Sequence, residues 1–116
     1  MKVSRDEKDG IVILRLRGKL IGGPDEADAL GDHVKEAIDS GKHHVLLDLN
    51  GVSMVNSTGI GILIVNYTRL RRSEGFLKLL NVAKRIQNVL YMTQLNTIFE
   101  SYSDEAEALA SFPQQS

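Results

Sequence analysis

The residues Val45-Leu46-Leu47-Asp48-Leu49 form a nearly continuous apolar run in the middle of the chain. A strand with one face in water alternates apolar and polar residues, whereas a strand covered on both faces shows a continuous run. We therefore predict a central strand over about residues 43–49. The rest of the fold must then place covering elements on both of its sides.

Strand and helix patterns alternate around this central strand. Residues 1–6 and the β-branched run 11–16 are separated by the turn segment EKDG, which predicts a hairpin. The spacing of apolar residues predicts helices over about 24–40, 57–73, 83–93 and 104–110, with a strand at 76–80 and a short one beginning at 98–99. Pro24 suits a first helical turn, Gly41 suits a helix end, and residues 50–56 are expected to form a loop.

The order of these elements, ββαβαβαβα, predicts an α/β fold. We expect a mixed sheet of four to five strands, with parallel pairs joined by right-handed crossovers and about four covering helices. A length of 116 residues fits a single domain. This domain should span residues 1–112, and residues 113–116 should form a frayed tail.

Composition excludes several classes of function. Lys and Arg total 14 against 15 Asp and Glu, and a net charge of -1 gives no long-range field to attract nucleic acid or an anionic membrane. The longest apolar stretch, 60–65, is far shorter than the ~20 residues that span a bilayer, so we expect no membrane insertion. The chain has no cysteine, and its N-terminus has no signal-peptide pattern, which together favour the cytoplasm.

No arrangement of residues predicts an enzyme, a cofactor or a metal site. The chain lacks the G-x-S-x-G turn of a Ser-His-Asp hydrolase. The pair Gly59 and Gly61 lacks the third glycine of a dinucleotide fingerprint and lies inside the predicted helix rather than before it. A metal site at His43 and His44 would need carboxylates from the preceding helix, so we expect these histidines to be the solvated ends of a helix and a strand.

The residues Asn56-Ser57-Thr58-Gly59 stand at the start of the predicted helix 57–73. A hydroxyl of Ser57 or Thr58 can cap free backbone N–H groups there and contribute about 1 kcal/mol. The same N–H groups and the helix dipole would also stabilise a phosphate on the hydroxyl, whose charge of about -1.5 to -2 would dominate locally. Considered alone, these residues leave both roles open.

The predicted helix 57–73 has two apolar faces at about 100° per residue. The face expected to cover the sheet carries Ile60, Leu63, Ile64, Tyr67 and Leu70. Gly61, Ile62 and Val65 fall on the other side, near Arg69 and Arg72. A solvent-facing stripe of this kind favours a docking surface; the alternative is that Ile62 and Val65 pack under a loop. The arginines also suit the negative end of the helix dipole.

The sequence as a whole resembles the STAS domain of bacterial anti-sigma factor antagonists. The segment Asn56-Ser57-Thr58-Gly59-Ile60-Gly61 is similar to the family motif D-S-[ST]-G-L-G. The resemblance covers nearly the whole chain, through Gly18-x-Leu20, Val45 to Leu49, Val52 to Val55, Leu79 to Val82 and Leu95 to Phe99.

This resemblance implies a partner-switching protein of transcription regulation. In the family, the serine after the acidic residue of the motif, here Ser57, is phosphorylated by the anti-sigma factor, an ATP-binding serine kinase with a histidine-kinase-like fold. A PP2C-type phosphatase removes the phosphate. The unphosphorylated antagonist binds the kinase and frees the sigma factor, and phosphorylation releases the antagonist. A dianion within a tight, partly apolar contact is costly to desolvate, which agrees with release.

Two positions depart from the family pattern. Asn56 replaces the acidic residue of the motif, and Ile21 replaces an aspartate that follows G-x-L. In the family these two carboxylates flank the serine and assist phosphoryl transfer or its metal. Their absence is compatible with slower phosphorylation, a different kinase or none, and Asp25 could partly substitute for them.

The expected site is therefore a phosphorylation switch at Ser57, flanked by Asn56, Thr58 and Gly59. The partner surface is expected to consist of Leu20, Ile21, Gly22, Gly23, Gly61, Ile62, Val65 and Arg69. The alternative function is a constitutive binding module, such as the STAS subunit of a lipid-transport complex or a stressosome-like assembly, in which Ser57 only caps the helix. The outer stripe would also allow a homodimer.

Overall fold

The computed structural model describes residues 1–113, apart from the side chains of residues 24, 26 and 27. Most of the predicted tail 113–116 therefore lies outside the described residues. The elements in chain order are β1 (Lys2–Lys8), β2 (Ile11–Leu20), α1 (Pro24–Asp39), β3 (His44–Val55), α2 (Ser57–Arg72), β4 (Phe76–Leu80), α3 (Lys84–Met92), a 3₁₀ turn (Leu95–Thr97), β5 (Ser101–Tyr102) and α4 (Glu105–Ala110).

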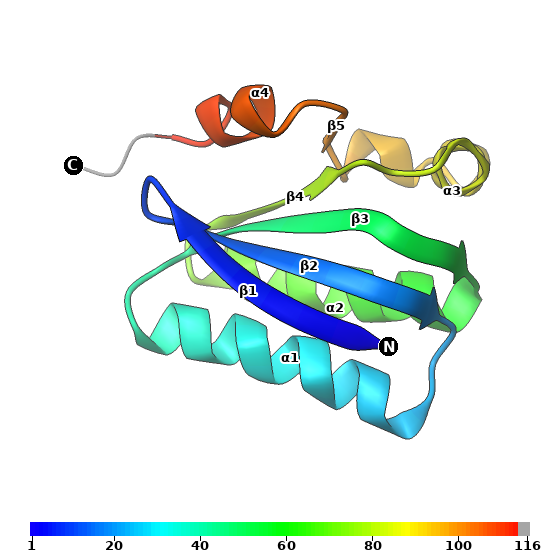
Figure 1. Ribbon diagram of the computed structural model, residues 1–116, viewed down its shortest axis with the longest axis horizontal. Coiled ribbons are helices and arrows are strands. Elements are labelled where there is room, and N and C mark those ends of the chain that lie inside the picture. Colours follow the sequence, from blue (N-terminus) through cyan, green and yellow to red (C-terminus); the bar gives the residue numbers. More distant parts are fainter. Residues whose placement is uncertain (114–116) are drawn as a thin grey trace.

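The strands form one mixed sheet in the spatial order β1-β2-β3-β4-β5 (Figure 1). β1 and β2 are antiparallel, and every later neighbouring pair is parallel. The hairpin turn is Asp9-Gly10, and both residues have positive φ, 55° and 78°. Two positive φ values are what a two-residue hairpin turn needs. The predicted fold class and element order are confirmed.

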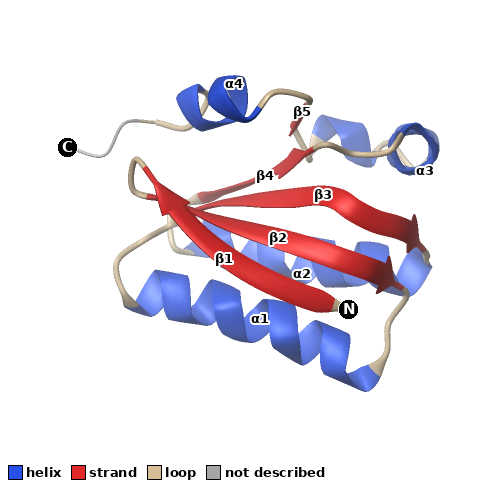
Figure 2. Ribbon diagram, in the orientation of Figure 1, coloured by secondary structure: helices blue, strands red, loops and turns tan. Residues whose placement is uncertain are grey.

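Two apolar layers enclose the sheet, and β3 contributes to both. α1 and α2 cover one face, and α4 lies over the other (Figure 2). Val45, Leu47 and Leu49 belong to the larger core under α1 and α2, whereas Leu46 packs with Ala108 of α4 and its neighbours. All four leucine and valine side chains named here are buried. The prediction of a central strand covered on both faces is confirmed.

The structure corrects the predicted ends of two strands. β3 continues through Val55, so residues 50–55 are a strand rather than a loop, and they pair with the long second half of β2 across two register shifts. The strand predicted at 98–99 is wrong, because Ile98 and Phe99 donate backbone hydrogen bonds to Leu95 and close a turn. β5 begins only at Ser101.

The expectation that both histidines are solvated is wrong for His44. Its side chain is buried at the start of β3, with ring centroids 5.7 Å from Phe76 and 5.5 Å from Phe112. The residues that follow α4 cover this end of the sheet, which the local sequence around His44 could not indicate. No helix in residues 1–113 is both long and apolar enough to cross a bilayer.

Candidate functional site

The first turn of α2 is capped by Asn56. Its Oδ1 accepts a hydrogen bond from the Gly59 backbone N–H at 2.9 Å, and its Nδ2 donates to the Ile21 carbonyl at 2.9 Å. Capping, one of the two roles left open for the hydroxyl of Ser57 or Thr58, is therefore not the role that the structure shows. The cap lies one residue earlier, and its amide also fixes the loop that follows β2.

The loop Leu20–Gly23 lies directly against this first turn. The Asn56 backbone N–H donates to the Leu20 carbonyl at 3.3 Å. A Cβ on Gly59 would collide with that carbonyl oxygen, and a Cβ on Gly22, whose φ is +92°, would collide with the Thr58 methyl group. Glycine is therefore required at both positions for the two segments to approach this closely.

Ser57 is exposed on this turn, and its hydroxyl has no hydrogen-bond partner among residues 1–113. The first turn of α2 also carries no acidic residue. The positive end of the helix dipole therefore acts on the space around Ser57 without opposition from a carboxylate in the same turn. This arrangement can accommodate an added negative charge on the hydroxyl.

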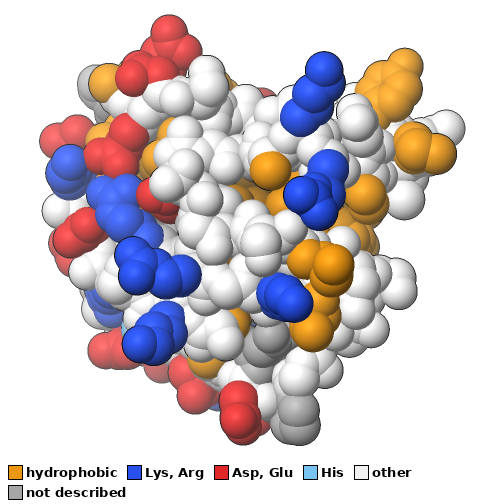
Figure 3. Space-filling view, turned by 45° about the vertical axis from the view of Figure 1, so that its right-hand side comes forward, with side chains coloured by type: hydrophobic (Ala, Val, Ile, Leu, Met, Phe, Trp, Pro, Cys, Tyr) orange, Lys and Arg blue, Asp and Glu red, His pale blue; other side chains and the backbone are white. Residues whose placement is uncertain are grey.

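Exposed apolar side chains lie next to this turn. Ile21 is 41% exposed and Met54 is 43% exposed, and Met54 pairs with Lys19 across β2 and β3. Figure 3, in which this end of the sheet is turned forward, shows hydrophobic side chains gathered on the right beside some Lys and Arg side chains, whereas acidic side chains lie mostly on the left, mixed with further Lys and Arg side chains. The exposed side chains beside the first turn of α2 thus include the apolar Ile21 and Met54.

The predicted division of α2 into a buried and an outer face is partly wrong. Val65 is 55% exposed as expected, but Ile62 is buried, and Ile64 is 36% exposed although it was expected to cover the sheet. α1 packs beside α2 on the same face of the sheet, so α2 is covered from its side as well as from the sheet. The buried arc is therefore rotated toward Ile62.

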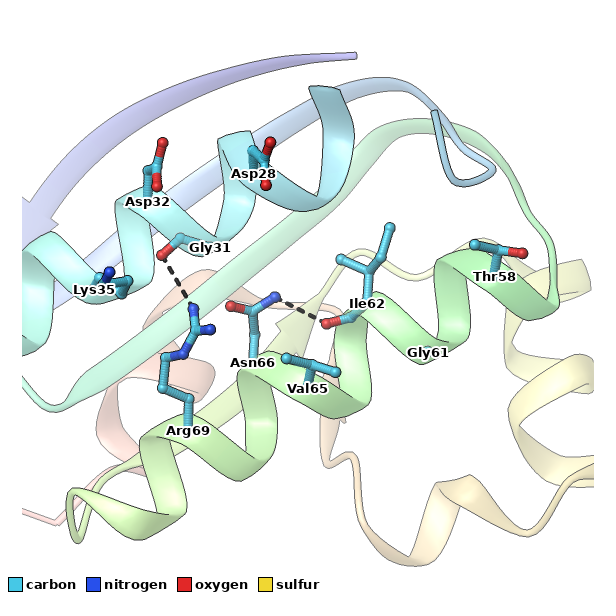
Figure 4. Close-up of a pocket in the computed structure, with 10 residues that line it drawn as sticks. All are labelled: Asp28, Gly31, Asp32, Lys35, Thr58, Gly61, Ile62, Val65, Asn66 and Arg69. Carbon is cyan, nitrogen blue, oxygen red and sulfur yellow. Dashed lines mark hydrogen bonds between the residues drawn. The ribbon is translucent and has the colours of Figure 1, made fainter. Parts of the chain in front are cut away.

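A groove of about 520 Å³ lies between α1 and α2 (Figure 4). Its α2 wall contains Gly61, Ile62, Val65 and Arg69, so four of the predicted partner-surface residues share one groove. The loop residues 20–23 are not part of its lining. Thr58, which was predicted as a neighbour of the phosphorylation site, also lines the groove, and the sequence interpretation missed the remaining residues, which are Asp28, Gly31, Asp32, Lys35 and Asn66. The four groove residues from α1 are spaced i, i+3, i+4 and i+7, so they share one face of the helix. This spacing could have identified them in the sequence as a group.

Two polar side chains of α2 lie within this groove. Asn66 is only 2% exposed; its Nδ2 donates to the Ile62 carbonyl at 2.9 Å, and its Oδ1 accepts no hydrogen bond from the described residues. Arg69 reaches across to α1 and donates to the Gly31 carbonyl at 3.4 Å. A Cβ on Gly61 would meet no atom within 4 Å.

The described side chains contain no group of three or more His, Asp or Glu placed to hold a metal ion. The groups of this region that can bind or be modified include the Ser57 hydroxyl, the backbone N–H groups at the start of α2, and the charged and apolar side chains that line the groove.

Comparison with known proteins gives consistent matches. Residues 2–108 match the family model described as STAS domain. The anti-sigma F factor antagonist of Paenibacillus polymyxa is 24% identical over 110 residues, which cover 94% of this chain and 92% of the relative.

Solved structures with the same fold include anti-sigma factor antagonists. A candidate antagonist of Thermotoga maritima superposes with a TM-score of 0.82 at 23% identity and covers 93% of this chain and 92% of its own. An antagonist of Mycobacterium paratuberculosis gives 0.77 at 20% identity, with coverages of 95% and 92%. The phosphorylated Bacillus cell fate determinant SpoIIAA gives 0.71 at 20% identity, with coverages of 94% and 97%.

Proposed function

The chain belongs to the STAS domain family, and on that premise we propose that it is an anti-sigma factor antagonist. It binds an anti-sigma factor serine kinase in the cytoplasm, is released when Ser57 is phosphorylated, and is reset by a PP2C-type phosphatase. It acts by binding and catalyses no reaction of its own. A relative named as an anti-sigma F factor antagonist aligns with 94% of the chain and supports this proposal.

The observation that carries the proposal is that Asn56, and not Ser57, caps α2. Asn56 already caps α2, so the Ser57 hydroxyl is not needed to hold the helix start. The hydroxyl is exposed and unbonded within the described chain, at the end of a helix where a phosphate gains from the dipole. A structural neighbour, SpoIIAA, has been solved in unphosphorylated and phosphorylated forms, which supports a modification of this kind.

The partner surface would extend on both sides of Ser57. On one side, the loop Leu20–Gly23 presents the exposed Ile21; on the other, Val65 is exposed at the rim of the groove, and Ile62 forms part of its wall. A phosphate between these apolar residues would have to be desolvated in the complex. Phosphorylation would therefore weaken binding without any rearrangement of the fold.

The test is to incubate the purified protein with its cognate kinase and ATP and to locate phosphate by mass spectrometry. Thr58→Val is the matched control, because it removes the neighbouring hydroxyl and keeps a β-branched side chain of similar size. We expect phosphate in the native protein and in Thr58→Val, and none in Ser57→Ala. A native protein without phosphate at Ser57 would refute the switch.

A second candidate is a constitutive binding or scaffold module. The observation in its favour is that the positions of the two family carboxylates are occupied by Asn56 and Ile21, with the Asn56 amide engaged in the cap and the loop. Asp25, in the first turn of α1, is the nearest acidic residue along the chain after that loop. Under this alternative, Ser57→Ala and Ser57→Glu would both keep full partner affinity, whereas the switch requires Ser57→Glu to lose it.

A further inference from the structure

The groove between α1 and α2 contains a glycine that the isolated protein does not need. Gly61 lies in the second turn of α2, where glycine disfavours the helix relative to alanine. At Gly59 a Cβ would collide with backbone, but at Gly61 it would meet no atom within 4 Å. The open space above Gly61 therefore serves no internal contact, and it leaves room for an atom from outside the chain.

The groove also offers acceptors that have no donors. Asp28 and Asp32 lie four residues apart on α1 and line the groove, and both are exposed without a hydrogen bond or ion pair to the described residues. The Oδ1 atom of Asn66 is buried without a donor, and Figure 4 shows the Asn66 amide between the two helices. A buried acceptor without a donor costs free energy, so an incoming donor would be favoured.

The cations of the groove are concentrated at one end. In Figure 4, Lys35 and Arg69 lie at one end of the groove, and Thr58 and Gly61 lie at the other, with Asp28 toward Ile62. Arg69 already places a guanidinium between the helices, where it donates to the Gly31 carbonyl. The spacing of α1 and α2 thus accommodates a guanidinium, and the half near Asp28 and Gly61 holds none.

We propose that this free half of the groove receives an arginine side chain from a docked protein partner. The aliphatic stem would pass over Gly61 and Val65, and the guanidinium would reach Asp28, with Asp32 and Asn66 as further acceptors. Arginine fits better than lysine because its planar group presents five donors. This proposal rests on the proposed function in one respect, which is that a protein partner docks on α2. Its test does not involve Ser57.

The test uses a pair of small probes of nearly the same shape, one with a charged guanidinium and the other with a neutral urea in its place. N-acetyl-arginine N-methylamide and its neutral citrulline counterpart are titrated into ¹⁵N-labelled protein, and chemical shifts are followed by NMR. We expect saturable shifts at the Asn66 side-chain amide and at the Gly61 backbone with the arginine probe, and none with the citrulline probe.

Variants then assign the site. The double variant Asp28→Asn/Asp32→Asn should bind the arginine probe about fivefold more weakly, equivalent to ~1 kcal/mol. Asp39→Asn is the control, because it removes one carboxylate charge from an exposed position of α1 outside the groove, and it should bind as the native protein does. Gly61→Leu should abolish the shifts while keeping the native thermal midpoint or raising it.

Three outcomes would overturn the proposal. They are equal binding of the citrulline probe, saturable shifts that map to residues outside the groove, and the absence of saturable shifts with the arginine probe. Because Ser57 is intact in every variant, kinase phosphorylation of Ser57 can fail while the groove still binds the probe, and the reverse also holds. The two proposals therefore succeed or fail separately.

Discussion

Two glycines in α2, Gly59 and Gly61, are two residues apart and should respond to alanine in opposite directions. At Gly61 the added methyl group meets no atom within 4 Å, so only the backbone effect remains. Alanine is favoured over glycine in a helix interior by about 0.5–1 kcal/mol, partly because it restricts the unfolded chain. Gly61→Ala should therefore raise the free energy of unfolding by about that amount, or the thermal midpoint by roughly 2–6 °C.

At Gly59 the same substitution should destabilise the protein. The new Cβ would collide with the Leu20 carbonyl oxygen and lie 2.9 Å from the Leu20 carbonyl carbon. Both are backbone atoms, so no change of rotamer relieves the contact. Overpacking typically costs about 1–3 kcal/mol, which exceeds the helix gain at this position.

Urea denaturation followed by circular dichroism measures both variants on the same scale. The difference between them should be about 1–3 kcal/mol, with Gly61→Ala above the native protein and Gly59→Ala below it. Destabilisation by Gly61→Ala would show that the position has an internal packing role, and the reasoning about the open groove would then be wrong. An unchanged m-value is the control that both variants unfold from a comparable native state.

Three further predictions concern the cap and the titration of buried or paired groups. Asn56→Ala should cost about 1–2 kcal/mol in urea denaturation, because both the cap and the loop bond are lost, and Asn56→Asp should cost less, because a carboxylate still caps. Burial, with smaller contributions from His43 and Lys78, lowers the pKa of His44 below 6.5, so the unfolded state binds the proton first. Stability should therefore fall as pH drops below about 6.5, and His44→Phe should remove this part of the pH profile. Hydrogen bonds from Lys8 and then Arg15 lower the pKa of Glu105 below 4.5 in the folded protein. The ionised carboxylate therefore stabilises the fold above pH 4.5, and this stabilisation is lost as the pH falls through the lowered pKa. Glu105→Gln should flatten the acid limb of a stability profile recorded by thermal denaturation.

The sheet could be predicted because its signals are local in the sequence. The continuous run Val45–Leu49 indicated a strand covered on both faces, and Leu46 and Leu47 do pack against opposite layers. Asp9-Gly10 between two apolar runs indicated a hairpin, and both residues adopt the positive φ values that such a turn requires. These features depend on residues within a few positions of one another.

The failures share one physical cause, which is packing between elements distant in sequence. The helical wheel placed Ile62 outside because it considered only the sheet as cover, whereas α1 also covers α2. His44 is buried by Phe76 and by Phe112, which is 68 residues away in the sequence. Asn66 and the acidic residues of α1 were missed for the same reason, since neither helix alone forms the groove.

The departure at residue 56 has a structural explanation that changes how the site is understood. An aspartate there could accept from the Gly59 N–H, but it could not donate to the Ile21 carbonyl, which the Asn56 Nδ2 contacts at 2.9 Å. A carboxylate oxygen of that aspartate and the Ile21 carbonyl oxygen are both acceptors and would repel each other. Asparagine therefore joins the loop to the helix start through one side chain, and it leaves the residue beside Ser57 uncharged. A phosphate on Ser57 would then experience the helix dipole without repulsion from residue 56. An uncharged residue 56 therefore lacks a carboxylate that could assist phosphoryl transfer. It also avoids the repulsion that such a carboxylate would exert on a phosphate at Ser57, and this favours the phosphorylated state.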